Sequence, residues 1–165
     1  MGGTTGSLMQ RLLDPSYMRR FSFIACNCED MCCRGWRVDI DRITYHTYRA
    51  VNLPKWRSAF RKHLVRNHEN PSPAQWAYIK LGSEKKCPFL TEEGFCGVQL
   101  DMGAQALSYV CATYPRGYKR LGGVLELTTT LSYPEIARLA LLDPDGIEFD
   151  DTVQQMDRRF CAINR

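Results

Sequence analysis

The chain has 165 residues, of which 44% are apolar and 24% are charged, a globular composition that excludes a disordered chain. Its 22 Lys and Arg residues against 18 Asp and Glu give a net charge of +4, and no dense basic run indicates a nucleic-acid-binding surface. No stretch approaches the roughly 20 apolar residues of a membrane helix. We therefore predict a protein that binds neither nucleic acid nor membrane.

The N-terminal sequence lacks the charged start and apolar centre of a secretory signal. This predicts a cytoplasmic protein, in which thiols stay reduced. The chain nevertheless contains 8 cysteines. In a reducing compartment a high cysteine count indicates metal binding more than it indicates disulfides.

Turn signals divide the chain into three segments. The sequence Asp14-Pro15-Ser16 is a turn signal, and an acidic stretch follows Pro144. We predict a loose N-terminal lead-in over 1–14, a cysteine-rich metal- or cluster-binding domain over 15–144, and a linker with the start of a further helical region over 145–165.

Within the central segment the apolar pattern predicts short helices and hairpins. Helices are expected after Asp41, from Pro54 through a stripe that ends at Val65, over 104–114, and after Ser132, whose hydroxyl stands three residues before Glu135 as in a capping box. Extended pieces are expected over 76–81 (or a helical turn there), over 87–98, and around a Gly122-Gly123 hairpin turn. The expected fold class is α+β, with small helical segments and short β-hairpins organised around a cysteine-ligated metal or iron–sulfur site.

Four of the cysteines lie within eight residues, at Cys26, Cys28, Cys32 and Cys33. Packing alone gives no reason to crowd thiols in this way, whereas thiolates that converge on a soft cation do. Three more follow at Cys87, Cys96 and Cys111. Thiolate sulfur selects zinc, copper(I) or iron–sulfur clusters.

The spacing of the cysteines leaves alternatives open. The two C-x2-C pairs of common zinc motifs are absent, and the radical-SAM spacing fails because Gly35 stands where its third cysteine would be. Disulfides or uncoordinated thiols remain alternatives to a metal. Cys26 and Cys161 are the weaker candidates, and the three histidines are better explained as surface or packing residues.

Four ordered blocks resemble the flagellin lysine-N-methylase family. They are Cys-Glu-Asp-x-Cys-Cys-x-Gly-Trp-x-Val-Asp-Ile-Asp over 28–41, Cys-Pro-Phe-Leu with Gly-Phe-Cys over 87–96, Leu-Ser-Tyr-Val-Cys-Ala-Thr-Tyr-Pro-Arg over 107–116, and Leu-Ser-Tyr-Pro-Glu-Ile-Ala-Arg-Leu-Ala-Leu over 131–141. The blocks are similar to the N-terminal cysteine-rich module of that family. The Cys-Cys core is also similar to a broader group of zinc- or iron-chelating proteins. Tyr133 stands where the family usually has a cysteine.

The resemblance implies a protein lysine N-methyltransferase, or the cluster-bearing N-terminal part of one. Such an enzyme uses S-adenosylmethionine and a cysteine-ligated iron–sulfur cluster, of the 4Fe-4S type, with flagellin or another lysine-bearing protein as substrate. The implied cluster ligands are Cys28, Cys32, Cys33, Cys87, Cys96 and Cys111. The alternative is a non-catalytic zinc- or iron-binding module.

Methyl transfer to a lysine needs a group that removes the proton of the ammonium. The amine has a pKa near ~10.4, so it is not nucleophilic at neutral pH without desolvation or a nearby base. The candidate catalytic residues are Asp39, Asp41, Tyr114 and Glu135, and the candidate residues for the carboxylate of the methyl donor are Arg116 and Arg138. No glycine-rich loop of the Rossmann type supports a separate donor site.

Overall fold

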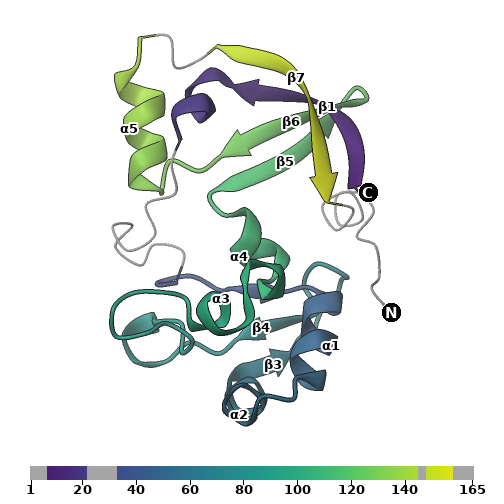
Figure 1. The fold of residues 1–165 in the computed structure, drawn as a ribbon, viewed down its shortest axis with the longest axis vertical. Helices are drawn as coiled ribbons and strands as arrows, with labels where there is room; N and C mark the ends of the chain where they lie inside the picture. Colours follow the sequence, from purple (N-terminus) through teal and green to yellow (C-terminus); the bar gives the residue numbers. More distant parts are fainter. Residues whose placement is uncertain (1–6, 22–32, 145–147, 158–165) are drawn as a thin grey trace. The chain divides into compact units, whose positions relative to one another are not determined.

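A computed structural model of the chain describes residues 7–21, 33–144 and 148–157 (Figure 1). For 7, 8, 156 and 157 only the backbone is described. The chain divides into two compact units, one formed by 1–24 with 115–165 and the other by 25–114. Both units combine helices with a small sheet, which confirms the α+β class. No helix in the described residues is long and apolar enough to cross a membrane.

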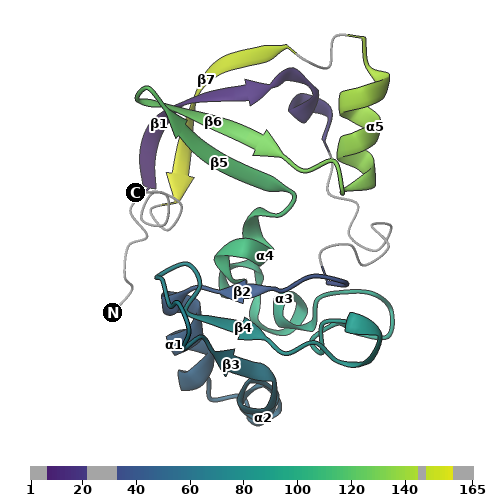
Figure 2. The same ribbon diagram turned by 180° about the vertical axis from the view of Figure 1, so that it is seen from behind.

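The first unit contains a four-stranded sheet in the order β5-β6-β1-β7. Its strands are β1 (Ser7–Pro15), β5 (Arg116–Leu121), β6 (Val124–Thr129) and β7 (Phe149–Asp157). Strand β1 pairs along its whole length with β7 in antiparallel orientation and runs parallel to β6, as the two views in Figures 1 and 2 show. Leu12, Leu125 and Leu127 form the small core on this sheet.

The hairpin between β5 and β6 confirms the predicted turn. Gly122 and Gly123 both have positive φ, at 53° and 87°, the conformation that a two-residue hairpin loop requires and that side chains disfavour. The short 3-10 helix η1 (Ser16–Arg20) and helix α5 (Pro134–Leu142) complete the described part of this unit.

Helix α5 begins where it is expected, but its cap is different. The residue at the N-cap is Tyr133, which makes no capping hydrogen bond with its side chain, and Pro134 takes the first turn. The predicted cap, Ser132, instead shares a hydrogen bond of 2.9 Å with the hydroxyl of Thr130. Tyr133 is fully buried and its ring meets that of Phe21 edge to face at 5.7 Å. Tyr133 therefore packs as a core residue.

Two expectations for the ends of the chain are wrong. The predicted loose lead-in contains β1, and the predicted linker and helical region contains β7. Neither strand shows the regular alternation of apolar and polar residues that marks a strand, and each is stabilised by its partner: Arg11 and Asp151 form a bidentate ion pair across them, and Leu12 is buried. Such pairing between distant segments leaves little local signal.

The second unit contains a three-stranded antiparallel sheet in the order β2-β4-β3. Its strands are β2 (Asp39–Ile40), β3 (Leu64–Arg66) and β4 (Ala77–Ile79). Its helices are α1 (Arg42–Ala50), α2 (Pro54–His63), α3 (Gly97–Met102) and α4 (Tyr109–Thr113), with the 3-10 turns η3 (Ser83–Lys85) and η4 (Ala104–Ala106).

Several helix bounds in this unit differ from the expectation. Helix α2 ends at His63, so Leu64 and Val65 belong to a strand and do not continue the helical stripe. The helix expected over 104–114 is two pieces, η4 and α4, separated by Leu107 and Ser108. The sequence 76–81 forms the strand alternative, β4.

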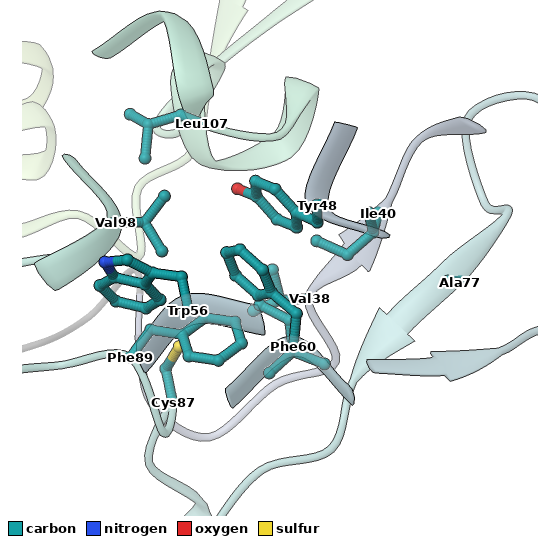
Figure 3. Close-up of a cluster of buried hydrophobic side chains, with 11 residues drawn as sticks. Val38, Ile40, Tyr48, Trp56, Phe60, Ala77, Cys87, Phe89, Val98 and Leu107 are labelled. Carbon is teal, nitrogen blue, oxygen red and sulfur yellow. The ribbon is translucent and has the colours of Figure 1, made fainter. Parts of the chain in front are cut away.

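The core of the second unit is a group of aromatic rings shown in Figure 3. Tyr48 of α1 stacks on Phe60 of α2 with centroids 4.1 Å apart, and Phe60 contacts both Trp56 and Phe89 within 5.4 Å. Aromatic pairs of this kind contribute about 0.5–1.5 kcal/mol each beyond the area that they bury. Cys87 is part of this core.

Asp14 in the first unit is strained electrostatically and generates a stability prediction. It stands directly across from Asp150, and its Oδ1 is buried with no hydrogen-bond partner. Burial raises the pKa of Asp14 above its ordinary value and the charge of Asp150 raises it further, against the opposing hydrogen bond from Gln154 and the charge of Arg116. A raised pKa in the folded state means that folding stability falls as the pH rises through the aspartate range.

We expect Asp14→Asn to stabilise the protein at neutral pH by about 0.2–1 kcal/mol, the size of a like-charge cross-strand pair. Thermal unfolding across pH 3–7 checks this, and the gain should shrink as the pH falls below the ordinary aspartate pKa. Asp151→Asn is the matched control, and it should lower the stability at neutral pH, because the ion pair with Arg11 lowers the pKa of Asp151. Equal shifts in both variants would contradict the account.

Candidate functional site

The four cysteines among the described residues line one cavity in the second unit. Its remaining wall is apolar or aromatic, formed by Val38, Ile40, Tyr48, Ile79, Phe89, Val98 and Leu107. Cys87 is buried, and Cys33, Cys96 and Cys111 are half-buried. No disulfide joins these four to one another. The cavity therefore gathers thiols from four separate segments of the chain.

Backbone hydrogen bonds hold Cys33 beside Cys87. The N–H of Cys87 donates to the carbonyl of Cys33 at 2.7 Å, and the N–H of Gly35 donates to Lys85 at 3.0 Å. Gly35 has a φ of 86°, so the turn that follows Cys33 depends on glycine.

A compact loop connects Cys87 to Cys96. The N–H of Leu90 donates to the carbonyl of Cys87 at 3.2 Å, which closes a turn over Pro88. Leu90 and Cys96 then form an antiparallel bridge. The residue after Cys96, Gly97, fits this packing because it has no side chain: a Cβ there would lie 3.0 Å from the Phe89 carbonyl oxygen and 3.2 Å from the Trp56 ring. The expected pair of extended pieces around a turn is thus reduced to a single bridge.

Cys111 is held through the start of α4. Ser108 is 1% exposed and its hydroxyl accepts from the N–H of Cys111 at 3.3 Å, which caps the helix. The N–H of Tyr109 donates to Asp41 Oδ2 at 2.9 Å. Asp41 thereby ties the segment that carries Cys111 to the end of β2.

Tyr48 is a cavity residue that the cysteine pattern does not reveal. Its hydroxyl donates to the carbonyl of Ala106 at 2.7 Å. Burial raises the pKa of Tyr48, and the Cys111 and Cys96 thiols would raise it further when ionised, so the phenol stays protonated at neutral pH. In the sequence, Tyr48 is recognisable only as an apolar position of the helix expected after Asp41, and such a position indicates packing and not a role in a site.

The remaining candidate ligands lie outside the described residues, namely Cys28, Cys32 and the weaker candidates Cys26 and Cys161. Within 7–21, 33–144 and 148–157, no three His, Cys, Asp or Glu side chains form a ligand group for one metal ion. The cavity measures about 20 Å³, room for one water molecule. The organisation of the fold around a metal or cluster therefore stays a prediction.

Two of the candidate catalytic residues lie at β2: Asp39 begins the strand and Asp41 follows its last residue. Asp39 pairs with Arg37 at 2.8 Å and accepts from the amide of Gln75 at 2.9 Å. Asp41 is 5% exposed and accepts from the N–H of Thr44 at 2.9 Å and from its hydroxyl at 2.8 Å, as the N-cap of α1. The structure thus uses Asp41 as a buried helix cap.

The other candidates divide between the units. Tyr114 ends α4, and its ring lies against that of Trp36 at 5.6 Å. In the first unit, Arg138 forms a bidentate ion pair with Glu135, which lowers the pKa of Glu135 and so weakens it as a base. Arg116 is exposed at the start of β5. The structure does not test the roles assigned to these residues.

Three bacterial relatives are similar to most of the chain. Lysine-N-methylase of Salmonella typhimurium and Lysine-N-methylase of Salmonella choleraesuis are each 32% identical over 139 residues, which is 84% of this chain and 34% of the relative. Flagellar biosynthetic protein FliU of Salmonella muenchen is 32% identical over 135 residues, 81% of this chain and 79% of the relative. The chain thus spans about a third of the two methylases.

No family model and no solved structure matches the chain. The similarity to these three relatives is therefore a similarity of sequence.

Asp41 is the residue whose loss should disturb the site most. We expect Asp41→Ala to destabilise the second unit by about 2–4 kcal/mol, because it removes a helix cap and leaves the buried N–H of Tyr109 without its acceptor. Urea unfolding followed by tryptophan fluorescence measures this, since Trp36, Trp56 and Trp76 all belong to that unit.

Asp39→Ala is the matched control for this experiment. It removes a carboxylate two residues away whose partner Arg37 is half exposed, so its cost should be about 1 kcal/mol or less. Equal costs for the two variants would contradict the role given to Asp41.

Proposed function

The chain belongs to the flagellin lysine-N-methylase family, and from this premise we propose that it is a protein lysine N-methyltransferase or the cysteine-bearing part of one. The observation that carries the proposal is the 32% identity to Lysine-N-methylase over 84% of this chain. Because the chain spans a third of that relative, the methyl transfer itself, its substrate and its donor are parts of the proposal.

The proposed substrate is a lysine side chain of flagellin or of another flagellar protein, and the proposed methyl donor is S-adenosylmethionine. The name of FliU, a flagellar biosynthetic protein, supports the flagellar setting. Arg116 offers an exposed guanidinium for the donor carboxylate, whereas Arg138 is already paired with Glu135. Of these two candidates, Arg116 is the better one.

The proposed cofactor is a cysteine-held iron–sulfur cluster. Four thiols line one apolar cavity, and this supports a bound cation. Ionised thiols cannot be buried there unless a cation balances their charge, and without a cation burial would keep the thiols protonated. Four of the six candidates would hold the group, namely four among Cys28, Cys32, Cys33, Cys87, Cys96 and Cys111. When bound, such a cluster supplies a redox centre and a crosslink between distant segments.

The type of ligand, cysteine sulfur, fits an iron–sulfur cluster, whereas the volume of the cavity does not. Each cysteine of a cluster binds a different iron, so cluster ligands lie farther apart than the ligands of one ion. A cavity of about 20 Å³ would have to widen to hold a cluster. This small volume favours the second candidate, a non-catalytic module that binds a single zinc or iron ion.

The described residues constrain how a lysine could be deprotonated. Tyr48 is kept protonated, Asp41 is engaged by three donors, and Glu135 is stabilised as a carboxylate by Arg138. Asp39 is the more exposed of the second unit's two candidate carboxylates, and it pairs with Arg37 at 2.8 Å. We therefore propose that deprotonation relies chiefly on desolvation of the substrate amine.

Anaerobic purification followed by iron, sulfide and zinc analysis tests the cofactor. We expect about four irons with matching sulfide per chain, and Cys87→Ser or Cys111→Ser should lose most of the iron. Cys161→Ser is the matched control and should keep it. Zinc alone, with no iron uptake on reconstitution, would favour the single-ion module and contradict the cluster.

Methyl transfer is tested with flagellin and isotopically labelled S-adenosylmethionine. We expect donor-dependent label on lysine, and none on flagellin whose lysines were chemically blocked beforehand. Cys87→Ser should abolish transfer if the metal centre is needed for turnover. A chain that binds its metal but neither binds the donor nor transfers methyl would be a binding module and not an enzyme.

A further inference from the structure

The stretch between Asp41 and Glu69 is strongly and uniformly basic. It contains seven Lys or Arg residues and all three histidines, but no Asp or Glu. It comprises α1, α2 and β3. The sequence pattern alone is that of a solvated helix face. What distinguishes it in the structure is the shape of the surface on α2.

The outer side of α2 lines an open groove of about 490 Å³. Its lining residues are Pro54, Arg57, Ser58, Arg61 and Lys62, which recur at the spacing of one helix face. The buried side of the helix holds Trp56 and Phe60 instead. The groove therefore combines three cations with a hydroxyl and a proline, and all five side chains are hydrophilic or small.

The three cations of the groove are not neutralised. Arg57 is held in place by neutral groups, donating to the carbonyl of Val51 at 3.2 Å and to the amide oxygen of Asn52 at 2.8 Å. On the same helix Lys55 pairs with Asp101, but in the described part of the chain no ion pair uses Arg57, Arg61 or Lys62. A guanidinium that is oriented but unpaired is preorganised for an anion.

This arrangement costs folding stability. Arg57 lies in the first turn of α2, next to the positive end of the helix dipole, and that turn contains no acidic residue. Arg57 and Arg61 also repel each other at i,i+4. Local rules of this kind are broken most often at functional surfaces, and here no acidic partner compensates the charge among the described residues.

We propose that this α2 groove binds an acidic segment of a partner protein, whose carboxylates face Arg57, Arg61 and Lys62. Carboxylates fit because the groove offers charge and hydrogen-bond donors but no exposed ring: Trp56 is 4% exposed and Phe60 is 1% exposed, so neither can stack on a nucleic-acid base. The inference does not rest on methyl transfer and holds for a metal-binding module as well.

The probe is a fluorescently labelled octaglutamate peptide, titrated with the full chain in about 0.1 M salt, where screening still leaves close charges in contact. We expect saturable binding that Arg61→Glu with Lys62→Glu weakens about tenfold or more, because each substitution turns an attraction into a repulsion. Arg61→Gln with Lys62→Gln should give a smaller loss of peptide affinity. This variant replaces the first one as the test if charge reversal near the end of α2 unfolds the helix.

The matched control is Lys80→Glu with Arg120→Glu, which changes the net charge equally at exposed positions outside the groove. It should change binding less than about twofold. Equal weakening in the control would show diffuse attraction and overturn the proposal, as would an absence of octaglutamate binding. Tighter binding of a single-stranded oligonucleotide of equal charge, lost in the same groove variants, would assign the groove to nucleic acid and overturn it too.

Discussion

The second unit depends on a buried carboxylate that starts two helices at once. Asp41 accepts hydrogen bonds from the N–H and hydroxyl of Thr44, which begin α1, and from the N–H of Tyr109, which begins α4. Helix α1 supplies Tyr48 to the cysteine cavity and α4 supplies Cys111. Hydrogen bonds to an ionised acceptor are the stronger kind, and burial strengthens them further. One carboxylate thus sets two walls of the site.

The apolar wall of the cavity and a bound metal would favour opposite protonation states of the four thiols. Cys87 lies in the same core as the packed rings of Tyr48, Phe60 and Phe89, an environment that suits neutral thiols and disfavours thiolates. A bound metal reverses that preference, because its positive charge stabilises the ionised sulfur. The same four thiols can therefore serve as core residues without the metal and as ligands with it, and metal binding would couple directly to the packing of this unit.

The sequence predicts the elements whose signals are local. Gly122-Gly123 requires a hairpin whatever surrounds it, and the helix after Asp41 carries its own cap and buried stripe. Cys33, Cys87, Cys96 and Cys111 were predicted to share a site because of their residue type, and they line one cavity. Strands β1 and β7 were missed because neither alternates apolar with polar residues and because each pairs with a partner about 140 residues away. Asp41 was a candidate base because a sequence does not show burial or the distant N–H of Tyr109.

The central claim is that Cys33, Cys87, Cys96 and Cys111 line a site where cysteine sulfur holds a metal or cluster. X-ray absorption at the iron edge of the anaerobically purified chain tests this claim most directly. The account predicts a first shell made of sulfur alone, with iron–iron scattering behind it. A first shell of oxygen and nitrogen, or iron that Cys33→Ser and Cys111→Ser leave unchanged, would contradict it.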